Sequence, residues 1–422
     1  VQQQVQQQVQ QQVQQQMQQL QQMQGIAFSV PLMPTGGYRA QPISPAMRWT
    51  TAPAPSSPRL HAHAPGSPGV PSGQVPASPS SLNLETARTP HDSSPSRASV
   101  KVPWGQLATV ATDPKGSRSL QELLPRLSKS QLARARDELA PHIYSLSRHT
   151  FGNYLISRLA TIDSMHEALV NAFRGKVVEL LCHAQGSRVV QALLNAKNAA
   201  DALELVAELD GNISECAVDT HGSWGVCVAF TVTHAKFILD QVADDVVGLS
   251  MQQHGCRVVQ AIIQTAADAG MDVSHAVEGV VAGGLEQLAL HRFANYAVQV
   301  ALRQCTSQQR EGMLSTLLPR LLAISTSKHG SNVAEVVLSL TSAQRLERIA
   351  DSIFGSSSAS ADALRQLMEH QFGNYVLQTL LRRLTDPQKR ASAIAKVRAA
   401  TTTSNFGRSV LSRLGEAEAQ VA

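Results

Sequence analysis

The 422-residue chain carries 36 Lys and Arg against 31 Asp and Glu, and 43% of its residues are hydrophobic. This length allows several domains or one long repeat array. Because the formal net charge is only +5, bulk charge does not indicate nucleic-acid binding, and any basic surface would have to be local. The five cysteines form no CxxC pair, which argues against a disulfide framework or a zinc site, and we expect no cofactor.

The first hundred residues differ in composition from the rest of the chain. Residues 1–24 are a Gln tract with Val or Met at every fourth position up to Met17, and residues 26–100 hold 14 of the 20 prolines. Such segments bury too little apolar surface to offset their ordering entropy, so we predict a disordered tail over residues 1–100. Residues 101–422 then form the folded part, with 31 basic and 29 acidic residues. We see no signal peptide and no membrane-spanning run, and we expect a cytoplasmic setting.

The folded part repeats a short motif. HQFGNYVLQTLL at 370–381 has near copies in HRFANYAVQVAL at 291–302 and HTFGNYLISRLA at 149–160. Alignment on the small residue of the motif, which we call the anchor, extends the series at intervals of 33 to 43 residues. The anchors are Gly116, Gly152, Gly186, Gly222, Gly255, Ala294, Gly330, Gly373 and Gly407. Nine occurrences at a period near 36 residues indicate a repeat protein.

Each repeat has the hydrophobic spacing of helices. In NYVLQTLL the apolar residues Val376, Leu377, Leu380 and Leu381 follow a three-to-four spacing, without strand-like alternation. Asp or His stands three residues before six of the anchors, where a helix start favours a capping side chain. The pattern therefore predicts an all-α solenoid whose repeats bury their faces against one another. The widest interval contains FGSSSASAD at 354–362, which we predict to be a surface loop.

Three positions after the anchor carry polar or flat side chains in phase. Positions +1 and +5 lie one helical turn apart on one face, whereas position +2 points about 100° to the side. Flat groups separated by hydrogen-bonding groups suit single-stranded nucleic acid, because bases stack on the former and present their edges to the latter. A solvated helix face and a peptide-binding surface are the alternatives, and the repetition in eight copies favours a binding function. The flat side chains are Tyr154, Tyr296, Tyr375, Trp224, Arg118, Arg188 and Arg257.

These strings resemble the Pumilio (PUF) family of RNA-binding proteins over about residues 101–422. GSRSLQ at 116–121 resembles a first repeat, and GNYLIS, GSRVVQ, GSWGVC, GCRVVQ, ANYAVQ, GSNVAE and GNYVLQ resemble the second to the eighth. NFGRSVLSRL at 405–414 resembles the C-terminal cap of the family, and we expect an N-terminal cap near residues 101–112. The resemblance implies a right-handed crescent of eight three-helix repeats that binds single-stranded RNA, with one base per repeat and the 5′ base at the eighth.

The resemblance also assigns residues to bases. From the eighth repeat back to the fifth, the sets are Asn374, Tyr375 and Gln378 for uracil; Ser331, Asn332 and Glu335 for guanine; Asn295, Tyr296 and Gln299 for uracil; and Cys256, Arg257 and Gln260 for adenine. Two further adenine sets are Ser187, Arg188 and Gln191 in the third repeat and Ser117, Arg118 and Gln121 in the first. The implied target is 5′-UGUANA(U)A-3′. The chemistry fits, because a carboxylate accepts from N1–H and N2–H of guanine, and an amide can both donate and accept.

Two repeats depart from the pattern. The second has Asn153, Tyr154 and Ser157, and the fourth has Ser223, Trp224 and Cys227. Ser157 is too short to replace a Gln contact, so we expect weak selection opposite the second repeat. Cys227 replaces the amide, so we expect a free choice of base opposite the fourth. Trp224 either stacks on a base or belongs to the core.

The resemblance further implies post-transcriptional repression or decay of messenger RNAs through their 3′ untranslated regions, by a monomer that recruits decay or translation-repression factors. A solenoid that binds structured or ribosomal RNA without sequence preference, and a protein-binding adaptor, stay open. We do not expect an enzyme, because no acid–base or nucleophile set stands out. Seven of the 14 histidines lie one or three residues before an anchor, where we expect cap duty: His149, His183, His221, His254, His291, His329 and His370.

Overall fold

The computed structural model describes residues 101–196, 199–400, 402 and 404–419. The chain divides into two compact units, Val1–Asp92 and Ser93–Ala422. The first unit lies outside the described residues, and so does the predicted disordered tail. Within the described ranges every regular element is a helix, and none of these helices is long and apolar enough to cross a membrane.

Triplets of helices follow one another from Leu107 to Ala399. The middle helices, which precede each anchor, are α2 (Leu107–Ala111), α5 (Ile143–Arg148), α8 (Val177–Leu181), α11 (Ile213–Val218), α14 (Val246–Ser250), α17 (Leu285–Leu290), α20 (Leu321–Ser325) and α23 (Ser358–Glu369). The inner helices, which begin at or near each anchor, are α3 (Pro114–Leu123), α6 (Gly152–Leu159), α9 (Gly186–Leu194), α12 (Gly222–Thr233), α15 (Gly255–Asp268), α18 (Asn295–Gln304), α21 (Gly330–Leu340) and α24 (Gly373–Arg383). The outer helices are α4 (Lys129–Leu139), α7 (His166–Phe173), α10 (Ala199–Ala207), α13 (Lys236–Asp244), α16 (Ser274–Ala282), α19 (Ser307–Leu317), α22 (Ala343–Phe354) and α25 (Pro387–Ala399). Short 3-10 turns adjoin some of them: η1 (Leu124–Arg126), η2 (Ala140–His142), η3 (Asp163–Met165) and η4 (Leu318–Arg320).

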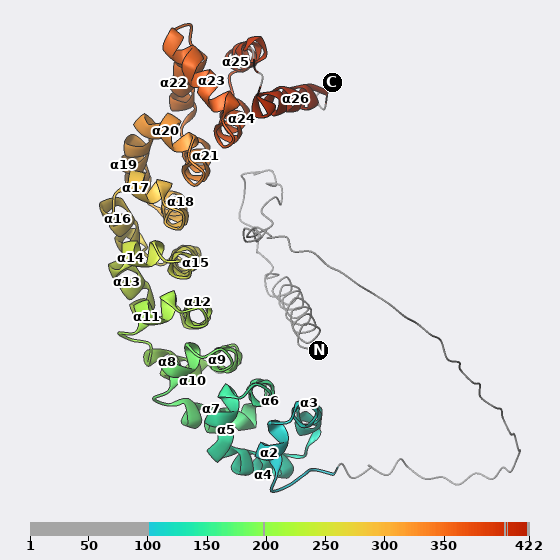
Figure 1. The fold of residues 1–422 in the computed structure, drawn as a ribbon. Helices are drawn as coiled ribbons and strands as arrows, with labels where there is room; N and C mark the ends of the chain where they lie inside the picture. Colours follow the sequence, from blue (N-terminus) through green and yellow to red (C-terminus); the bar gives the residue numbers. More distant parts are fainter. Residues whose placement is uncertain (1–100, 197–198, 401, 403, 420–422) are drawn as a thin grey trace, which may run out of the picture. The chain divides into compact units, whose positions relative to one another are not determined.

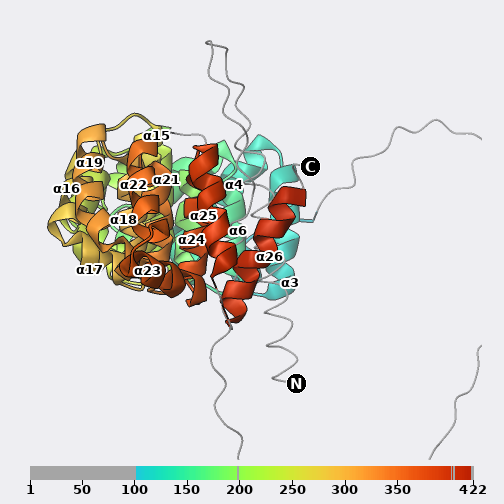
Figure 2. The same ribbon diagram turned by 90° about the horizontal axis from the view of Figure 1, so that it is seen from above.

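Within the unit Ser93–Ala422 the triplets stack into a curved array (Figure 1). The inner helices line its concave side, and the outer helices lie on the opposite side. Each inner helix packs against the next, from α3 on α6 to α21 on α24. The array ends with α26 (Asn405–Ala419), which lies beside α24 and α25 when the stack is viewed from above (Figure 2). The predicted α-solenoid is therefore confirmed.

The core repeats because every middle helix presents the same face inward. The residue nine positions before the anchor is apolar and buried in all eight triplets. These residues are Leu107, Ile143, Val177, Ile213, Val246, Leu285, Leu321 and Leu364. Full burial of one such side chain contributes about 1.5–3 kcal/mol, so neighbouring faces hold the array together without a single central core.

A close backbone approach explains the small anchor. A Cβ atom built on any of the seven anchor glycines from Gly116 to Gly373 would lie only 2.3–3.0 Å from the carbonyl oxygen of the residue six positions earlier. The inner helix thus begins in direct contact with the middle helix, where a side chain has no room. The sixth repeat has Ala294 instead, and its inner helix begins one residue later, at Asn295.

Two sequence predictions about this fold are wrong. Residues 101–112 do not form a separate cap, because α2 has the buried residue, spacing and contact with α3 of an ordinary middle helix. FGSSSASAD is also not a loop beyond Gly355–Ser357, because residues from Ser358 onward form the first turns of α23. The Ser357 side chain caps that helix by accepting from the backbone N–H of Ser360 at 3.1 Å, so the extra residues lengthen a helix.

Candidate nucleic-acid interface

The side chains at position +1 are buried in all eight repeats. They are Ser117, Asn153, Ser187, Ser223, Cys256, Asn295, Ser331 and Asn374. The sequence places positions +1 and +5 on one helix face, and at position +1 the protein itself covers that face. The cause is that position +1 lies in the first helical turn, directly beneath the loop that enters the inner helix.

The three asparagines at position +1 use their amide hydrogens to hold that loop. Asn374 Nδ2 donates to the carbonyls of His370 and Gln371, each at 2.9 Å. Asn153 and Asn295 each donate in the same way to the two equivalent carbonyls, at 2.8 to 3.2 Å. Each amide therefore bonds two carbonyls of the entering loop, and the first of these, that of the His, also accepts the backbone N–H of the same Asn. The amide oxygen remains as an acceptor.

The serines at position +1 in the first and third repeats link neighbouring repeats. Ser117 Oγ donates to the carbonyl of Phe151 at 2.8 Å, and Ser187 Oγ donates to the carbonyl of His221 at 3.0 Å. Both acceptors stand directly before the next anchor. Position +1 is thus a structural position as well as a candidate binding position, and its residue type sets how neighbouring inner helices meet.

The side chains at position +5 contact those at position +1 in four repeats. The Nε2 group of each Gln donates to the side chain one turn earlier in four repeats: Gln121 to Ser117 at 3.2 Å, Gln191 to Ser187 at 2.8 Å, Gln299 to Asn295 at 3.1 Å and Gln378 to Asn374 at 3.2 Å. These bonds fix the orientation of each amide. They leave the second Nε2 hydrogen of each Gln as a donor, and in Gln121, Gln191 and Gln299 they also leave Oε1 as an acceptor.

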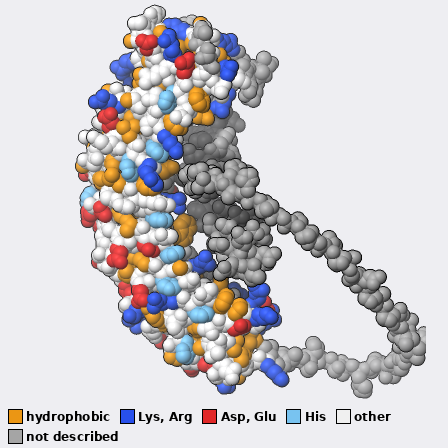
Figure 3. Space-filling model, in the orientation of Figure 1, with side chains coloured by type: hydrophobic (Ala, Val, Ile, Leu, Met, Phe, Trp, Pro, Cys, Tyr) orange, Lys and Arg blue, Asp and Glu red, His pale blue; other side chains and the backbone are white. Residues whose placement is uncertain are grey.

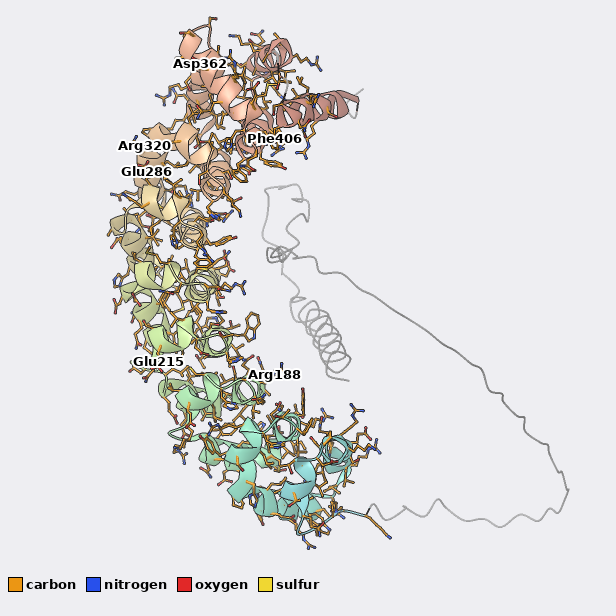
Figure 4. All side chains as sticks on the ribbon, in the orientation of Figure 1. Arg188, Glu215, Glu286, Arg320, Asp362 and Phe406 are labelled. Carbon is orange, nitrogen blue, oxygen red and sulfur yellow. The ribbon has the colours of Figure 1, made fainter. Side chains whose placement is uncertain are left out.

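The flat side chains at position +2 are the exposed part of the row. Arg118, Tyr154, Arg188, Trp224, Arg257, Asn332 and Tyr375 are exposed, and Tyr296 is partly buried. Figure 4 shows Arg188 on the concave side of α9, whereas Glu215, Glu286 and Arg320 lie on the outer side of the array. Trp224 is 56% exposed, so the alternative that it belongs to the core is excluded. The three arginines supply the local positive charge that the net charge does not reveal.

The predicted helix caps are mostly confirmed. Asp113, His149, His183, Asp219, His291 and His370 each accept a hydrogen bond from the backbone N–H of the anchor, at 2.7 to 3.4 Å. The histidines directly before an anchor do not cap: His221, His254 and His329 make no side-chain cap bond. Figure 3 shows the histidines as a column along one face of the stack. Burial lowers the pKa of His183, with the charges of Arg148 and His221 adding to the effect.

The seventh repeat has an acidic side chain in a hydrogen-bonded network. Glu335 Oε2 accepts from Thr379 Oγ1 of the next inner helix at 3.0 Å, and Thr379 in turn accepts from Arg382 Nη2 at 2.7 Å. Sequence reasoning selected Glu335 but missed Thr379 and Arg382. The Thr379 hydroxyl contacts Oε2, which leaves Oε1 of the carboxylate as a further acceptor.

The two departing repeats lack an amide at position +5. Burial raises the pKa of the Cys227 thiol to about 12, so the fourth repeat presents a neutral thiol beside Ser223 and Trp224. In the second repeat Ser157 is partly buried, and its side chain is shorter than the Gln that stands at this position in five other repeats. These positions offer little with which to select a base edge.

One contact in the site comes from outside the repeats. Arg413 of α26 donates from Nη1 to Gln378 Oε1 at 2.7 Å, and its guanidinium lies 5.8 Å from the centroid of the Tyr375 ring. The eighth repeat therefore has a cation at its candidate base position. The C-terminal segment was expected to act as a cap, and the sequence carried no signal that it would reach this side chain.

Stacked triplets with a periodic row of polar and flat side chains define an α-solenoid repeat protein. A family model described as "Pumilio-family RNA binding repeat" matches residues 106–140, 142–156, 176–209, 245–269, 285–318 and 364–391. The chain belongs to the Pumilio (PUF) family.

Individual relatives agree with this assignment. A Pumilio domain-containing protein of Schizosaccharomyces pombe is 26% identical over 330 residues, covering 76% of this chain and 47% of the relative. Fem-3 mRNA-binding factor 2 of Caenorhabditis elegans is 28% identical over 316 residues, covering 66% of this chain and 50% of the relative. The chain thus spans about half the length of these curated relatives.

Solved structures share the fold. PUF-8 in complex with PBE-RNA matches with a TM-score of 0.66 and 22% identity, covering 74% of this chain and 92% of that one. The Puf3 RNA-binding domain bound to a Cox17 RNA 3′ UTR recognition sequence matches with a TM-score of 0.63 and 22% identity, covering 74% and 94%.

Proposed function

We propose that the concave row binds single-stranded RNA and that each repeat contacts one base. The observation that carries the proposal is the phase of the row. In all eight repeats the side chain at position +2, a flat group in seven of them and Asn332 in the seventh repeat, lies beside the buried side chain at position +1 and the half-buried or buried side chain at position +5. The similarity to proteins whose solved structures contain RNA supports the same function. Flat groups that repeat with one base-edge group each are the usual arrangement for reading single strands.

The proposed target is 5′-UGUANA(U)A-3′, with its 5′ base at the eighth repeat. In the third-base position, Gln299 keeps one Nε2 hydrogen and Oε1 for a base, because its other hydrogen is bonded to Asn295. One donor and one acceptor side by side complement N3–H and a carbonyl oxygen of uracil. Gln191 and Gln121, which are held by serines instead, would present the same two groups to adenine.

The second base is proposed to be guanine because Glu335 presents a carboxylate. A carboxylate that faces a base is costly unless it meets donors, and guanine offers N1–H and N2–H together. Thr379 already donates to Oε2, so Oε1 has the greater free capacity. The hydroxyl holds the carboxylate in one orientation, which reduces the ordering cost on binding.

In the cell, we infer that the protein regulates messenger RNAs after transcription, through sites in their 3′ untranslated regions. Repression or decay would require decay or translation-repression factors as partners, and a monomer of this chain suffices for RNA binding because all eight repeats lie on one chain. The cytoplasm is the compartment in which this activity is proposed.

The decisive experiment changes Glu335 and the base opposite it. We expect Glu335→Gln to weaken binding of 5′-UGUAAAUA-3′ by about 1–3 kcal/mol, the usual scale for one base-edge pair. Adding Asn332→Arg gives the seventh repeat the residue types of the third, and preference at the second base should move toward adenine. Titration of the guanine-bearing and adenine-bearing RNAs against both variants measures this.

Thr379→Val is the matched control, because it removes the hydroxyl that contacts Glu335 but keeps the carboxylate. If Glu335 only links two repeats, then Thr379→Val and Glu335→Gln should weaken both RNAs equally. Equal losses on guanine and adenine would contradict the proposed register. They would favour a solenoid that binds RNA without sequence preference, and failure of both RNAs to bind the parent protein would favour a protein-binding adaptor.

A further inference from the structure

Two cysteines from neighbouring repeats lie close together on the outer part of the array. Cys182 directly follows α8 and is partly buried, whereas Cys216 lies within α11 and is fully buried. Their sulfur atoms are 3.8 Å apart and hydrogen-bonded, although 34 residues separate them in the sequence. Both are free thiols. A bonded pair of sulfurs lies at about 2.05 Å, so only a small displacement separates this pair from a disulfide.

Cys182 opens into a surface hollow. The hollow has a volume of about 700 Å³ and is lined by Gly175, Lys176, Val178, Glu179, Cys182, Glu208 and Glu215. Figure 4 shows Glu215 on the side of the array opposite Arg188, so the hollow lies away from the candidate RNA row. Its lining carries three carboxylates against one ammonium group. An uncharged small molecule can enter such a site more easily than an anion.

We propose that Cys182 and Cys216 form a peroxide-sensitive dithiol that closes to a disulfide between the third and fourth repeats. The Cys182 thiolate attacks one oxygen of hydrogen peroxide, the O–O bond breaks, and hydroxide leaves and becomes water by taking up the thiol proton. Cys182 is then a sulfenic acid. The Cys216 sulfur attacks the Cys182 sulfur, the S–O bond breaks, and a second water leaves. Two thiols are oxidised and one peroxide is reduced to two waters.

The division of roles follows from the surroundings of the two thiols. The hydrogen bond with Cys216 lowers the pKa of Cys182, although burial and the charges of Asp219 and Glu215 act in the opposite direction. The same hydrogen bond and burial raise the pKa of Cys216. Cys182 is therefore both the more accessible and the more readily ionised sulfur, as the attacking group requires. Cys216 is the buried resolving thiol, which protects the intermediate from further oxidation.

The disulfide would join two elements that position candidate base contacts. A Cβ atom on the anchor Gly222 would lie 3.1 Å from Cys182 Sγ and 2.7 Å from the Cys216 carbonyl oxygen. Cys182 therefore already packs against the start of α12. The Ser187–His221 hydrogen bond crosses the same boundary between repeats. A covalent bond here restrains how α9 and α12 move relative to each other.

Peptide mapping of the full-length chain tests the proposal. The reduced protein is treated with increasing hydrogen peroxide, alkylated, digested without reductant and analysed by mass spectrometry. Met251, which is 45% exposed, reports the peroxide dose through its sulfoxide. We expect a Cys182–Cys216 linked peptide at doses below those that oxidise Met251, its loss on treatment with dithiothreitol, and slower amide exchange in α11 while the link is present.

Cysteine variants and a second oxidant complete the test. Cys182→Ser and Cys216→Ala should abolish the linked peptide, whereas Cys305→Ala, at another buried cysteine, should keep it. The proposal would be overturned if Met251 is oxidised while Cys182 and Cys216 are both recovered in alkylated form, because alkylation marks thiols that stayed reduced. Accumulation of Cys182 sulfinic acid in the parent protein would overturn it as well. Glutathione disulfide, which is anionic, should react more slowly than peroxide; an equal or higher rate would overturn the assignment of a neutral oxidant.

Discussion

The sixth and eighth repeats carry the same cap and candidate contact residues, but these residues have different surroundings. Each has His three residues before the anchor and Phe one residue before it, with ring centroids 6.0 Å apart in the sixth repeat and 5.7 Å in the eighth. Asn295 and Asn374 hold their loops through the same pairs of carbonyls, and Gln299 and Gln378 bond to them at 3.1 and 3.2 Å. The buried halves of the two sites are therefore chemically equivalent.

The exposed halves differ because the array ends after the eighth repeat. Gln378 Oε1 accepts from Arg413 of α26, whereas no residue in the described part of the chain donates to Gln299 Oε1. The sixth repeat presents a donor and an acceptor side by side. The eighth presents donors from both the amide and the guanidinium. The comparison shows that repeats with the same contact residues present different hydrogen-bonding groups when the neighbouring element differs.

The largest expected effect concerns protein stability and tests whether the buried halves of the sixth and eighth repeats are equivalent. Asn295→Ala and Asn374→Ala should each lower the free energy of unfolding by about 1–3 kcal/mol, because each removes the side-chain donor of two loop carbonyls, of which the His carbonyl keeps a backbone donor. Urea unfolding followed by helical circular dichroism measures the change. Ser157→Ala is the control and should have little effect. Losses that differ widely between the two Asn variants would show that the two sites are not equivalent below the surface.

The next largest effect concerns base selection and tests the exposed halves of the sixth and eighth repeats, which differ in the contact from Arg413. Cytosine and uracil both offer acceptors to a donor-rich site, so the parent should discriminate between them weakly at the first RNA base and strongly at the third. Arg413→Ala frees Gln378 Oε1 and should raise discrimination at the first base by about 1 kcal/mol, toward the value at the third. Arg408→Ala, on the same helix, should leave discrimination unchanged. The proposed role of Arg413 fails if both variants behave alike in RNA titrations.

A smaller effect extends the comparison to the helix starts, where the third repeat uses His183 and the fourth uses Asp219. His183 must be unprotonated at Nδ1 to accept from the backbone, and its pKa lies below the ordinary 6.5, mainly because of burial. A lowered pKa contributes stability above pH 6.5 that is lost as the pH falls through the folded-state value.

His183→Asp should therefore reduce the pH dependence of the unfolding free energy between neutral and mildly acidic pH, since Asp219 performs the same cap as a carboxylate. Unfolding curves of parent and variant across that range give the comparison. If the unfolding free energy falls by the same amount in both proteins as the pH is lowered, His183 is not the cause of the pH dependence.

The smallest effect concerns the first hundred residues. Neither the sixth nor the eighth repeat draws a candidate contact residue from them, so deletion of residues 1–100 should change RNA affinity by less than tenfold, about 1.4 kcal/mol. Titration of the shortened chain with the same RNA measures this. A larger loss of affinity would show that the tail contributes to the RNA site, and the repeats alone would then not account for binding.

Much of this molecule follows from local sequence. The period, the buried residue nine positions before each of the first eight anchors, and the caps at Asp113, His183 and Asp219 all depend on residues within one repeat. Helix starts and apolar stripes are short-range features, because hydrogen bonds and side-chain neighbours lie three or four residues apart. For the same reason, the sequence placed the candidate contact positions on one helix in every repeat.

The tertiary structure decided what those positions face. Asn374 is buried because the entering loop folds over it, Arg413 reaches Gln378 from 35 residues away, and Cys182 meets Cys216 across a boundary between repeats. Residues 358–362 form the first turns of α23 because the Ser357 side chain caps the start of that helix, although the Ser-rich string by itself favours a loop. Such contacts depend on how successive helices stack, and no periodicity within a single repeat contains that geometry.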